Sequence, residues 1–578
     1  MNTPIAIHQI PQVVTAELVV VGGGLAGLCA AVSAARNGVK TILVQDRPMP
    51  GGNSSSEIRM WICGATSPAY REGGLLEELK LANCHYNPTL KYTLWDQVMR
   101  DFLEREPNLE CYFSTTVQEV VCQDQRIQAV RAWGLTDYLH YEFRGKYFAD
   151  CSGDSILALS GAEYMIGRED AAVFQEPWGR PCTDAQTMGN SIILQLRRTG
   201  DNRPFHAPAW AYHYTDQTVP RPDLARPGDN FWWLEFGGVK DVITDNREIT
   251  RELQRVALGY WEYIKNHPDG RGDGWSLDWI GSLAGKRESR RYVGDYILTQ
   301  NDILQNRRFG DAVAYGGWPL DDHHPEAIYA NDAANRAQSV PQGYHIPYRC
   351  LYSRNVQNLF FAGRNISVTH LGLSSTRVMA TCATLGQAVG TAAAVANHHG
   401  CLPHEVGVEH LVELQQLLML QDQFLPGLRR QPSHAAQLGR PSDPRLVNGA
   451  ERDDAGAPED NALLLRAGAS CSYVFPSATP VGGVRLVWDS NFQDAKRMRL
   501  DEGEDEAHGV PECLGQAYRV EAKVAGKWKT IHQADDNFRR LDLARFPTVL
   551  AEELRLTLVQ ERVPGKPARL FAFEPLDP

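Results

Sequence analysis

The chain has 578 residues, which is enough for several domains at about 150 residues each. Hydrophobic residues make up 43% and charged residues 22% of it, as in an ordinary globular protein. The net charge of −12 argues against a nucleic-acid or anionic-membrane partner and favours a small-molecule substrate.

The N-terminus and the cysteines predict a cytoplasmic protein. The first residues, Met1 to Ile7, lack a basic region followed by a long apolar core, so we expect no secretory signal. No stretch approaches the roughly 18 uncharged apolar residues that a membrane helix needs. The twelve cysteines are scattered without any CxxC pair. Their spacing predicts reduced thiols, no metal site and no iron–sulfur cluster.

An apolar run over residues 17–21 ends in glycines and opens a helix. Gly22 allows a tight turn, Gly24 lets a pyrophosphate approach the backbone, and Gly27 lets the helix pack on the strand. An alanine-rich helix over 28–37 and a second strand over 39–44 complete a βαβ unit. The pattern predicts a nucleotide site that includes Gly22, Gly24, Leu25, Ala26 and Gly27.

A carboxylate about 20 residues after the glycines is expected to hold the ribose hydroxyls. Gln45 stands at the expected place and Asp46 follows it. We divide the ribose role between the two and favour Asp46 because of its charge. Arg47 is included in the predicted site.

A glycine- and hydroxyl-rich loop over 49–57 follows the second strand. Its donors suit the phosphates and ribityl chain of a flavin, and the predicted contacts are Gly51, Gly52, Asn53, Ser54, Ser55 and Ser56. Here the sequence resembles the FAD-dependent oxidoreductases with two dinucleotide folds. More narrowly, it resembles a family that reads GGN(A/S)SSE(I/V)R after this strand and is distantly related to heterodisulfide-reductase-like flavoproteins. The resemblance implies FAD and an α/β FAD-binding, Rossmann-like domain of the glutathione-reductase type.

The segments up to residue 170 continue this domain. We expect a helix over 92–106, and strands over 109–113, 117–121, 127–133 and 139–147 that include a small antiparallel insertion. The run 147–154 resembles the family's second flavin motif and adds Ser152, Gly153 and Asp154 to the site. The alternative is an ordinary strand-end turn, which Ser-Gly-Asp also suits. A helix-like segment over 155–161 favours the flavin motif.

Residues 171–345 are the predicted α+β substrate domain, rich in tryptophan and proline. It contains strand-like runs over 231–236 and 293–298 and a helix over 247–267. The cationic run 285–292 is either a solvated face or, as the resemblance favours, a junction element that meets an anionic substrate group or the flavin phosphates. The run 321–324 is predicted to be a polar loop rather than a metal site, since adjacent strand residues point to opposite sides.

The chain returns to the FAD-binding domain at 346–430. The strand 358–365 and a helix over 374–397 resemble the last flavin motif, which implies contacts from Gly363, Arg364, Ser375 and Thr376. The positive helix N-terminus would face the flavin pyrimidine oxygen. The resemblance covers about 16–397.

The C-terminal residues 431–578 read as an all-β sandwich. Alternating strands over 483–488, 518–524, 528–532 and 554–559 follow a helix over 408–420 and a loop-rich linker over 425–458. The pattern resembles a discoidin-type, galactose-binding-like module, a fold that either binds sugar or only packs. We expect residues 431–578 to fold as their own unit.

The sequence thus predicts an FAD-dependent oxidoreductase that oxidises a small organic substrate, a carbohydrate or polyol, by hydride transfer to flavin N5. The alternatives are an NAD(P)H-linked flavin reductase and a non-catalytic carbohydrate-binding protein. The lack of a second GxGxxG domain argues against the flavin reductase. His370 is the first candidate for the catalytic base, its alternative role being a structural hydrogen bond, with His324 and His345 next. Arg377, Arg59 and Arg287 are the candidate cations for the substrate or its oxyanion.

Overall fold

The computed structural model describes residues 10–227, 231–453, 461–498 and 509–578. The chain forms two compact units. The first comprises Met1–Ala65, Lys91–Gln415 and Arg497–Glu506, and the second comprises Thr66–Leu90, Gln416–Lys496 and Ala507–Pro578. The N-terminal segment on which the signal-peptide expectation rests lies outside the described residues.

A five-stranded parallel sheet in the order β19-β8-β2-β3-β4 is the centre of the first unit. Every residue of β2, β3, β8 and β19 is buried, as is usual for a parallel sheet that is covered on both faces. The predicted βαβ unit and Rossmann-like α/β fold are confirmed. The strands are β2 (Leu18–Val21), β3 (Thr41–Val44), β4 (Leu109–Tyr112), β8 (Tyr147–Asp150) and β19 (Leu359–Phe361).

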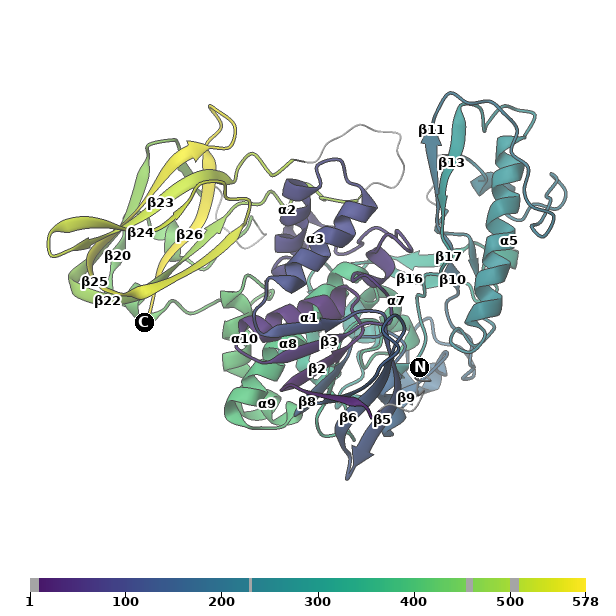
Figure 1. Cartoon of the computed structure of the whole chain (residues 1–578), viewed down its shortest axis with the longest axis horizontal. Helices are drawn as coiled ribbons and strands as arrows, with labels where there is room; N and C mark the ends of the chain where they lie inside the picture. The colour runs from purple at the N-terminus through teal and green to yellow at the C-terminus, as the bar shows by residue number, and fades with distance from the viewer. Residues whose placement is uncertain (1–9, 228–230, 454–460, 499–508) are drawn as a thin grey trace, which may run out of the picture. The chain divides into compact units, whose positions relative to one another are not determined.

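Helices α1 (Leu25–Arg36) and α8 (Met379–His399) lie side by side against this sheet (Figure 1). A Cβ atom at Gly386 would lie 1.9 Å from the Ala26 carbonyl oxygen, so only glycine permits this approach. Among the described helices, α8 is the one long and apolar enough to cross a membrane, but 94% of its apolar window is buried inside the protein. Its apolar character is therefore explained by packing in the core.

A second sheet in the order β1-β7-β6-β5 contains the predicted antiparallel insertion. The sequence pattern missed β1, which pairs in parallel with β7. The elements are β1 (Gln12–Thr15), β5 (Thr115–Gln123), β6 (Arg126–Gly134), β7 (His140–Arg144) and the preceding helix α3 (Tyr92–Glu104).

The region after β8 is built from short, two-stranded sheets and contains one long helix, α5. The apolar face of α5 buries Tyr260, Trp261 and Ile264 against Trp233 and Leu194. The pairs are β10–β12, β11–β13, β14–β9, β15–β18 and β16–β17. The elements are β9 (Tyr164–Met165), α4 (Ala171–Phe174), β10 (Asn190–Ser191), β11 (Leu194–Arg198), β12 (Glu235–Phe236), α5 (Asn246–Lys265), β13 (Trp275–Ile280), β14 (Arg291–Tyr292), α6 (Gln300–Leu304), β15 (Ala312–Gly316), β16 (Leu320–His323), β17 (Asn335–Gln338) and β18 (Tyr344–Pro347).

Several predicted elements of the first unit differ in the structure. The strand expected over 231–236 is reduced to β12, and β14 replaces the strand expected over 293–298. The segment Ile156–Ser160 is a 3₁₀ turn. The predicted helix 374–397 is two helices, α7 (His370–Thr376) and α8, since Arg377 and Val378 break the run. The helix expected over 408–420 is also two, α9 (Pro403–Glu409) and α10 (Leu411–Leu420).

The second unit is the predicted all-β sandwich together with a helix from an earlier part of the chain. Its sheet runs in the order β21-β26-β22-β25-β23-β24, and β20 pairs with β22. The long strands β22 and β25 are interrupted by bulges, which lets one strand bend around the core. The elements are α2 (Leu75–Tyr86), α11 (His434–Leu438), β20 (Arg440–Pro441), β21 (Leu463–Leu465), β22 (Ser470–Trp488), β23 (Gly515–Val524), β24 (Lys527–Ala534), β25 (Leu541–Glu561) and β26 (Ala568–Leu576).

The second unit is larger than the predicted domain 431–578. Leu81 of α2 belongs to the sandwich core. Lys496 Nζ lies 2.9 Å from Glu77 Oε1, and both side chains are buried. The Arg540 guanidinium donates to Asp422 at 2.8 Å. These contacts correct the predicted boundary, because residues 66–90 and 416–430 complete the core and satisfy its buried charges.

We therefore expect Glu77→Gln and Lys496→Met, made singly in the full chain, to lower the free energy of unfolding by about 3–5 kcal/mol each. Burial opposes the charge on Glu77, yet Lys496 and Lys80 hold the pKa of this carboxyl below its ordinary value, so removing one partner strands the other. Denaturant titration of the second unit's tryptophan fluorescence measures the loss.

The double variant Glu77→Leu/Lys496→Met should recover most of the loss, since it leaves no uncompensated charge. The exposed pair Lys566–Glu512 is the matched control. Lys566→Met should cost at most about 1 kcal/mol. Equal losses in the buried and exposed single variants would show that α2 is not held by this pair.

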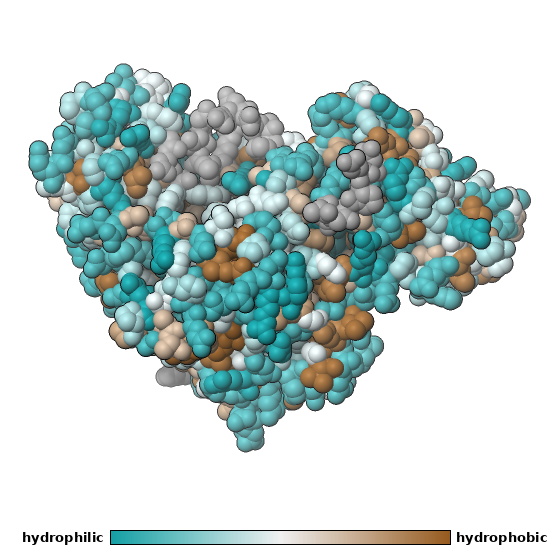
Figure 2. All heavy atoms as spheres, turned by 180° about the vertical axis from the view of Figure 1, so that it is seen from behind, coloured by the Kyte–Doolittle hydropathy of each residue, from teal (hydrophilic) through white to brown (hydrophobic). Residues whose placement is uncertain are grey.

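The face of the molecule seen in Figure 2 is mainly hydrophilic, and its hydrophobic residues form small separate patches. Such scattered exposure is normal for a folded protein surface.

Candidate active site

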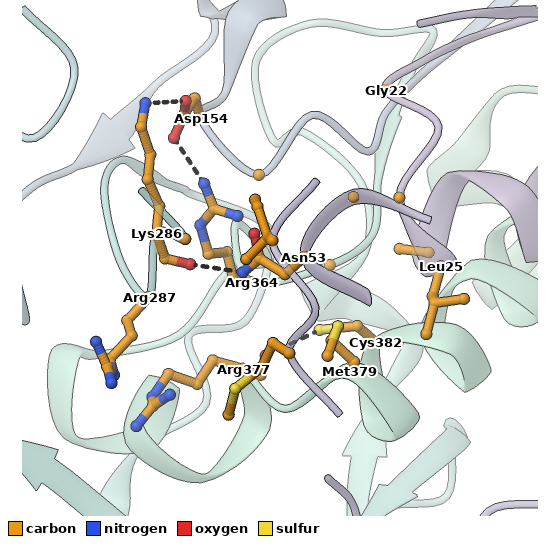
Figure 3. A pocket seen from close by; sticks show the side chains of 18 of the residues that line it. Gly22, Leu25, Asn53, Asp154, Lys286, Arg287, Arg364, Arg377, Met379 and Cys382 are labelled. Carbon is orange, nitrogen blue, oxygen red and sulfur yellow. Dashed lines mark hydrogen bonds and ion pairs between the residues drawn. The ribbon is translucent and has the colours of Figure 1, made fainter. Parts of the chain in front are cut away.

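A cavity of about 780 Å³ lies in the first unit and is lined by residues at the ends of the sheet strands, in β16 and at the start of α8. Figure 3 shows some of the side chains that line it. The cavity brings together most of the predicted site residues, although they are far apart in sequence. The predicted residues that line it are Gly22, Gly24, Leu25, Ala26, Gln45, Asp46, Arg47, Gly51, Gly52, Asn53, Ser152, Gly153, Asp154, Arg287, Gly363, Arg364 and Arg377.

The turn from β2 into α1 needs its glycines for three separate reasons. Gly22 has φ +98°, and a Cβ atom there would lie 2.5 Å from Ser152 Cα. At Gly27 a Cβ atom would lie 1.8 Å from the Gly22 carbonyl oxygen, so this glycine closes the turn rather than lining the cavity. At Gly24 a Cβ atom would approach only Gly52 Cα, at 4.0 Å. The free N–H groups of α1 therefore open onto the cavity and fit a pyrophosphate.

The end of β3 separates the two candidate ribose ligands. The Gln45 side chain accepts a hydrogen bond from Gly23 N at 2.7 Å and donates to Met49 O at 3.3 Å, so it supports the turn. Asp46 is exposed and lines the cavity. This arrangement favours Asp46 as the ligand of the ribose hydroxyls.

The loop after β3 contributes its glycines and Asn53, but its serines point elsewhere. Ser54 Oγ and Ser55 Oγ donate to the carbonyls of Gly51 and Gly52 at 2.9 and 2.8 Å. Ser56 Oγ lies 3.4 Å from Met49 Sδ. The predicted role of these three serines is corrected: their hydroxyls shape the loop, while the glycine backbone forms the cavity wall.

The second flavin segment places two cations on the cavity wall. Asp150 at the end of β8 accepts bonds from Ser152 Oγ at 2.6 Å and Leu157 N at 2.7 Å, which fixes the turn. Asp154 accepts from Lys286 at 2.6 Å and from Arg364 at 2.7 Å (Figure 3). Although burial opposes its charge, Arg364 and Lys286 hold the pKa of Asp154 below its ordinary value. The group carries excess positive charge, as a phosphate-bearing ligand requires.

The start of α8 forms the other end of the cavity. Arg377, Val378, Met379 and Cys382 line it, so the positive end of a 21-residue helix faces inward. Ser375 and Thr376 are buried one turn earlier, and Ser375 Oγ donates to Trp318 O at 2.5 Å. The predicted cofactor contacts of these two residues are therefore corrected to contacts within the fold.

His370 and Arg59 also lie outside the cavity lining. Both ring nitrogens of His370 face carboxylates: Nδ1 is 2.9 Å from Glu288 and Nε2 is 3.0 Å from Asp322. Burial alone would lower the pKa of this imidazole, but Glu288 and Asp322 outweigh burial and raise the pKa to about 10. Because this imidazolium lies outside the cavity lining, it is not placed to take a proton from a bound substrate. The structural alternative considered for His370 is the one the geometry supports.

Arg59 is held by aromatic rings. Its guanidinium carbon lies 4.3 Å from the ring centre of Trp279, and Nη1 donates to Gln195 at 2.5 Å. The predicted substrate-binding role of Arg59 is corrected accordingly.

A continuous chain of charged groups lies along the wall near the start of α8. His323 Nδ1 is 2.7 Å from Glu235, and His323 Nε2 is 3.2 Å from Asp321. Glu235 lies 3.4 Å from Arg287, and Asp321 accepts from Arg377 at 3.0 Å. Four of the five residues, all but Glu235, line the cavity.

Sequence reasoning missed Asp321 and His323 because the run 321–324 resembled a polar loop. Residues 321–323 of this run instead belong to β16, which pairs with β17. The expected alternation of side chains is present: Asp321 and His323 line the cavity, whereas Asp322 contacts His370. The alternation was thus the signal that pointed to one shared face. The tryptophans Trp61, Trp232 and Trp318, together with Cys63 and Asn335, complete this wall.

The parallel sheet, the uncapped glycine turn and the cationic wall define a dinucleotide-binding flavoprotein. The family model described as "FAD dependent oxidoreductase" matches residues 17–418, well over half of the chain. The chain belongs to this family, its cofactor is FAD, and it is an enzyme.

Solved structures resemble parts of the chain at low identity. A geranylgeranyl bacteriochlorophyll reductase-like protein from Thermoplasma acidophilum is 13% identical over 71% of this chain and 90% of its own, with a TM-score of 0.32. A family 32 carbohydrate-binding module of EndoD from Streptococcus pneumoniae is 15% identical over 20% of this chain and 76% of its own, with a TM-score of 0.16. A protein described as an alpha-L-fucosidase from Bacteroides thetaiotaomicron is 18% identical, with a TM-score of 0.14. The match covers 20% of this chain and only 21% of that protein.

We expect Gly24→Val to fold but to bind FAD at least about tenfold more weakly. Gly24 has φ −65° and ψ 178°, which valine adopts readily, and a Cβ atom meets nothing closer than 4.0 Å. The added side chain would instead occupy the space in front of the helix N-terminus where a pyrophosphate fits. Flavin absorbance per protein and titration of the apoprotein with FAD measure the loss.

Gly310→Val is the control, since a Cβ atom at Gly310 has nothing within 4 Å. Acid precipitation should release the flavin from the wild type, because we expect non-covalent binding. Normal FAD affinity in Gly24→Val would show that the pyrophosphate lies elsewhere.

Proposed function

We propose that the protein oxidises a carbinol of a small polar substrate, a carbohydrate or polyol, to the carbonyl. The observation that carries the proposal is the linked set Arg287–Glu235–His323–Asp321–Arg377, of which all but Glu235 line the same cavity as the glycines predicted to bind FAD. When bound there, FAD supplies a hydride acceptor.

His323 replaces His370 as the base in this proposal. Glu235 holds Nδ1 at 2.7 Å, which fixes the ring orientation and leaves Nε2 on the side of Asp321. The substrate hydroxyl would take the place of Asp321 at Nε2 and give its proton to that nitrogen as its carbon loses hydride. The Arg287 and Arg377 guanidinium groups, which line the same cavity, favour negative charge on the bound substrate.

The cavity residues around these charged groups support a sugar-like substrate. Trp61, Trp232 and Trp318 offer apolar faces to the C–H groups of a substrate and exclude water, while Asn335 and Asp321 offer polar contacts to hydroxyls. Burial raises the pKa of the Cys63 thiol to about 11, so thiolate chemistry at neutral pH is not favoured. The resemblance of the sandwich to galactose-binding modules is consistent with a carbohydrate substrate.

The test is anaerobic bleaching of the purified yellow holoenzyme by a panel of sugars and polyols, each without NADH. We expect at least one to reduce the flavin within seconds to minutes. Bleaching by NADH or NADPH alone, with none by the panel, would favour the flavin-reductase alternative.

We also infer a cytoplasmic location, which the twelve cysteines support because none forms a disulfide.

A further inference from the structure

Two buried guanidinium groups lie on the same wall of the cavity, beside the proposed base. The side chains of Arg287 and Arg377 are only 10% and 11% exposed. They come from segments 90 residues apart, and Figure 3 shows both extending to the same side of the cavity. Burial, together with repulsion from Arg377, lowers the pKa of Arg287 despite the opposing pull of Glu235. Two cations that line one cavity and repel each other favour an anionic group on the ligand.

Hydrogen bonds to neutral backbone carbonyl groups orient the Arg287 and Arg377 side chains. Arg287 donates to Gly189 O at 3.1 Å and to Trp232 O at 2.9 Å. Arg377 donates to Asp321 O at 3.1 Å as well as to the Asp321 carboxylate. Both side chains are therefore fixed before any ligand arrives, which is how a specific site differs from a mobile surface charge.

The carboxylates nearby are shared rather than dedicated to the arginines. Glu235 lies 3.4 Å from Arg287 but 2.7 Å from His323 Nδ1. Asp321 contacts Arg377, His323 and Asn335 at once. Two carboxylates thus serve two guanidinium groups, an imidazole and an amide. This leaves donor capacity on the arginines for an acceptor with two oxygens.

We propose that Arg287 and Arg377 seat a carboxylate of the substrate, so that the enzyme acts on an anionic hydroxy acid of the sugar-acid type. The inference rests on the proposed oxidation and narrows its substrate class. The guanidinium fork matches a carboxylate, and the neighbouring His323 places the reacting hydroxyl close to that group. In the reaction the carbinol carbon gives a hydride to FAD, the hydroxyl gives its proton to His323, and the carboxylate is unchanged.

The test compares acids with neutral compounds of similar size on the holoenzyme. Gluconate is paired with glucitol, and glucuronate with glucose. Binding is followed by perturbation of the flavin absorbance spectrum, and reduction is followed by anaerobic bleaching. We expect at least one acid to bind tenfold or more tightly than its neutral partner, and Arg287→Gln and Arg377→Gln to reduce this preference to twofold or less. Arg203→Gln, at an exposed arginine paired with Asp201, is the control and should leave the preference unchanged.

The outcomes separate the two proposals. Equal affinity for acid and neutral partners, or no spectral response to any of the four, overturns the carboxylate site, even if a neutral sugar bleaches the flavin. Tight binding of an acid without bleaching supports the carboxylate site and contradicts the proposed oxidation. Loss of FAD from both arginine variants would show that these arginines hold the cofactor, which also overturns the inference.

Discussion

His323→Asn should slow reduction of the flavin by substrate by about 10²-fold or more while leaving FAD bound. The imidazole lines the cavity with Glu235 fixed on Nδ1, and asparagine has no group that accepts a proton at neutral pH. Rapid mixing of the reduced substrate with oxidised holoenzyme under anaerobic conditions measures the rate constant for bleaching.

His345→Gln is the matched control for this substitution. His345 is also buried and accepts a bond from Phe309 N at 3.2 Å, but it lies outside the cavity lining. We expect its reduction rate to stay near that of the wild type. A Glu235→Gln variant should show an intermediate rate, because it keeps a hydrogen bond to Nδ1 but removes the charge that orients the ring. An unchanged rate in His323→Asn would exclude this histidine as the base.

The nucleotide-binding half of the molecule was predictable because its constraints are local. A strand, three glycines and a helix within residues 17–38 require one another sterically, so the spacing of Gly22, Gly24 and Gly27 indicates the turn directly. The loop serines were misread because Ser and Thr hydroxyls, Asn amides and Asp carboxylates often form hydrogen bonds with nearby backbone groups. Ser54 and Ser55 do so through the carbonyls three residues earlier.

The catalytic half was harder to predict because its contacts join distant segments. Glu235, Asp321 and His323 meet only after β12 and β16 take their places, and the helical or strand period of the sequence carries no information on that pairing. His370 attracted attention because it follows Gly363 closely in sequence. Its structural role depends on contacts with Glu288 and Asp322, which lie 82 and 48 residues away in the sequence.

The boundary of the sandwich shows the same limitation. The alternating strands from residue 483 onward predicted a β module, but the helix that completes its core, α2, comes from residues 75–86. The burial of Lys496, which requires a buried anion such as Glu77, is visible only in the folded structure, so the sequence alone did not indicate this boundary.

The charge on His370 makes stability depend on pH, and the sign follows from its raised pKa. The ordinary histidine pKa near 6.5 describes the unfolded chain, whereas the folded pKa is about 10. The stabilising contribution is fully present below about pH 6.5 and is lost progressively as the pH rises through about 10. A shift of this size corresponds to on the order of 5 kcal/mol.

We therefore expect His370→Gln to destabilise the protein strongly at pH 7 and hardly at all above pH 10. At neutral pH the variant leaves Glu288 and Asp322 without the cation between them. Arg291 still pairs with Glu288 and also binds Glu169, and it limits the loss at that carboxylate. His324 is a half-buried histidine directly after β16, the strand that contains Asp322. His324→Gln should show little change in stability at any pH. Thermal unfolding of wild type and both variants between pH 6 and 10.5 measures the effect. A constant difference between wild type and His370→Gln across this range would mean that His370 is neutral in the folded protein, and would return it to consideration as a base.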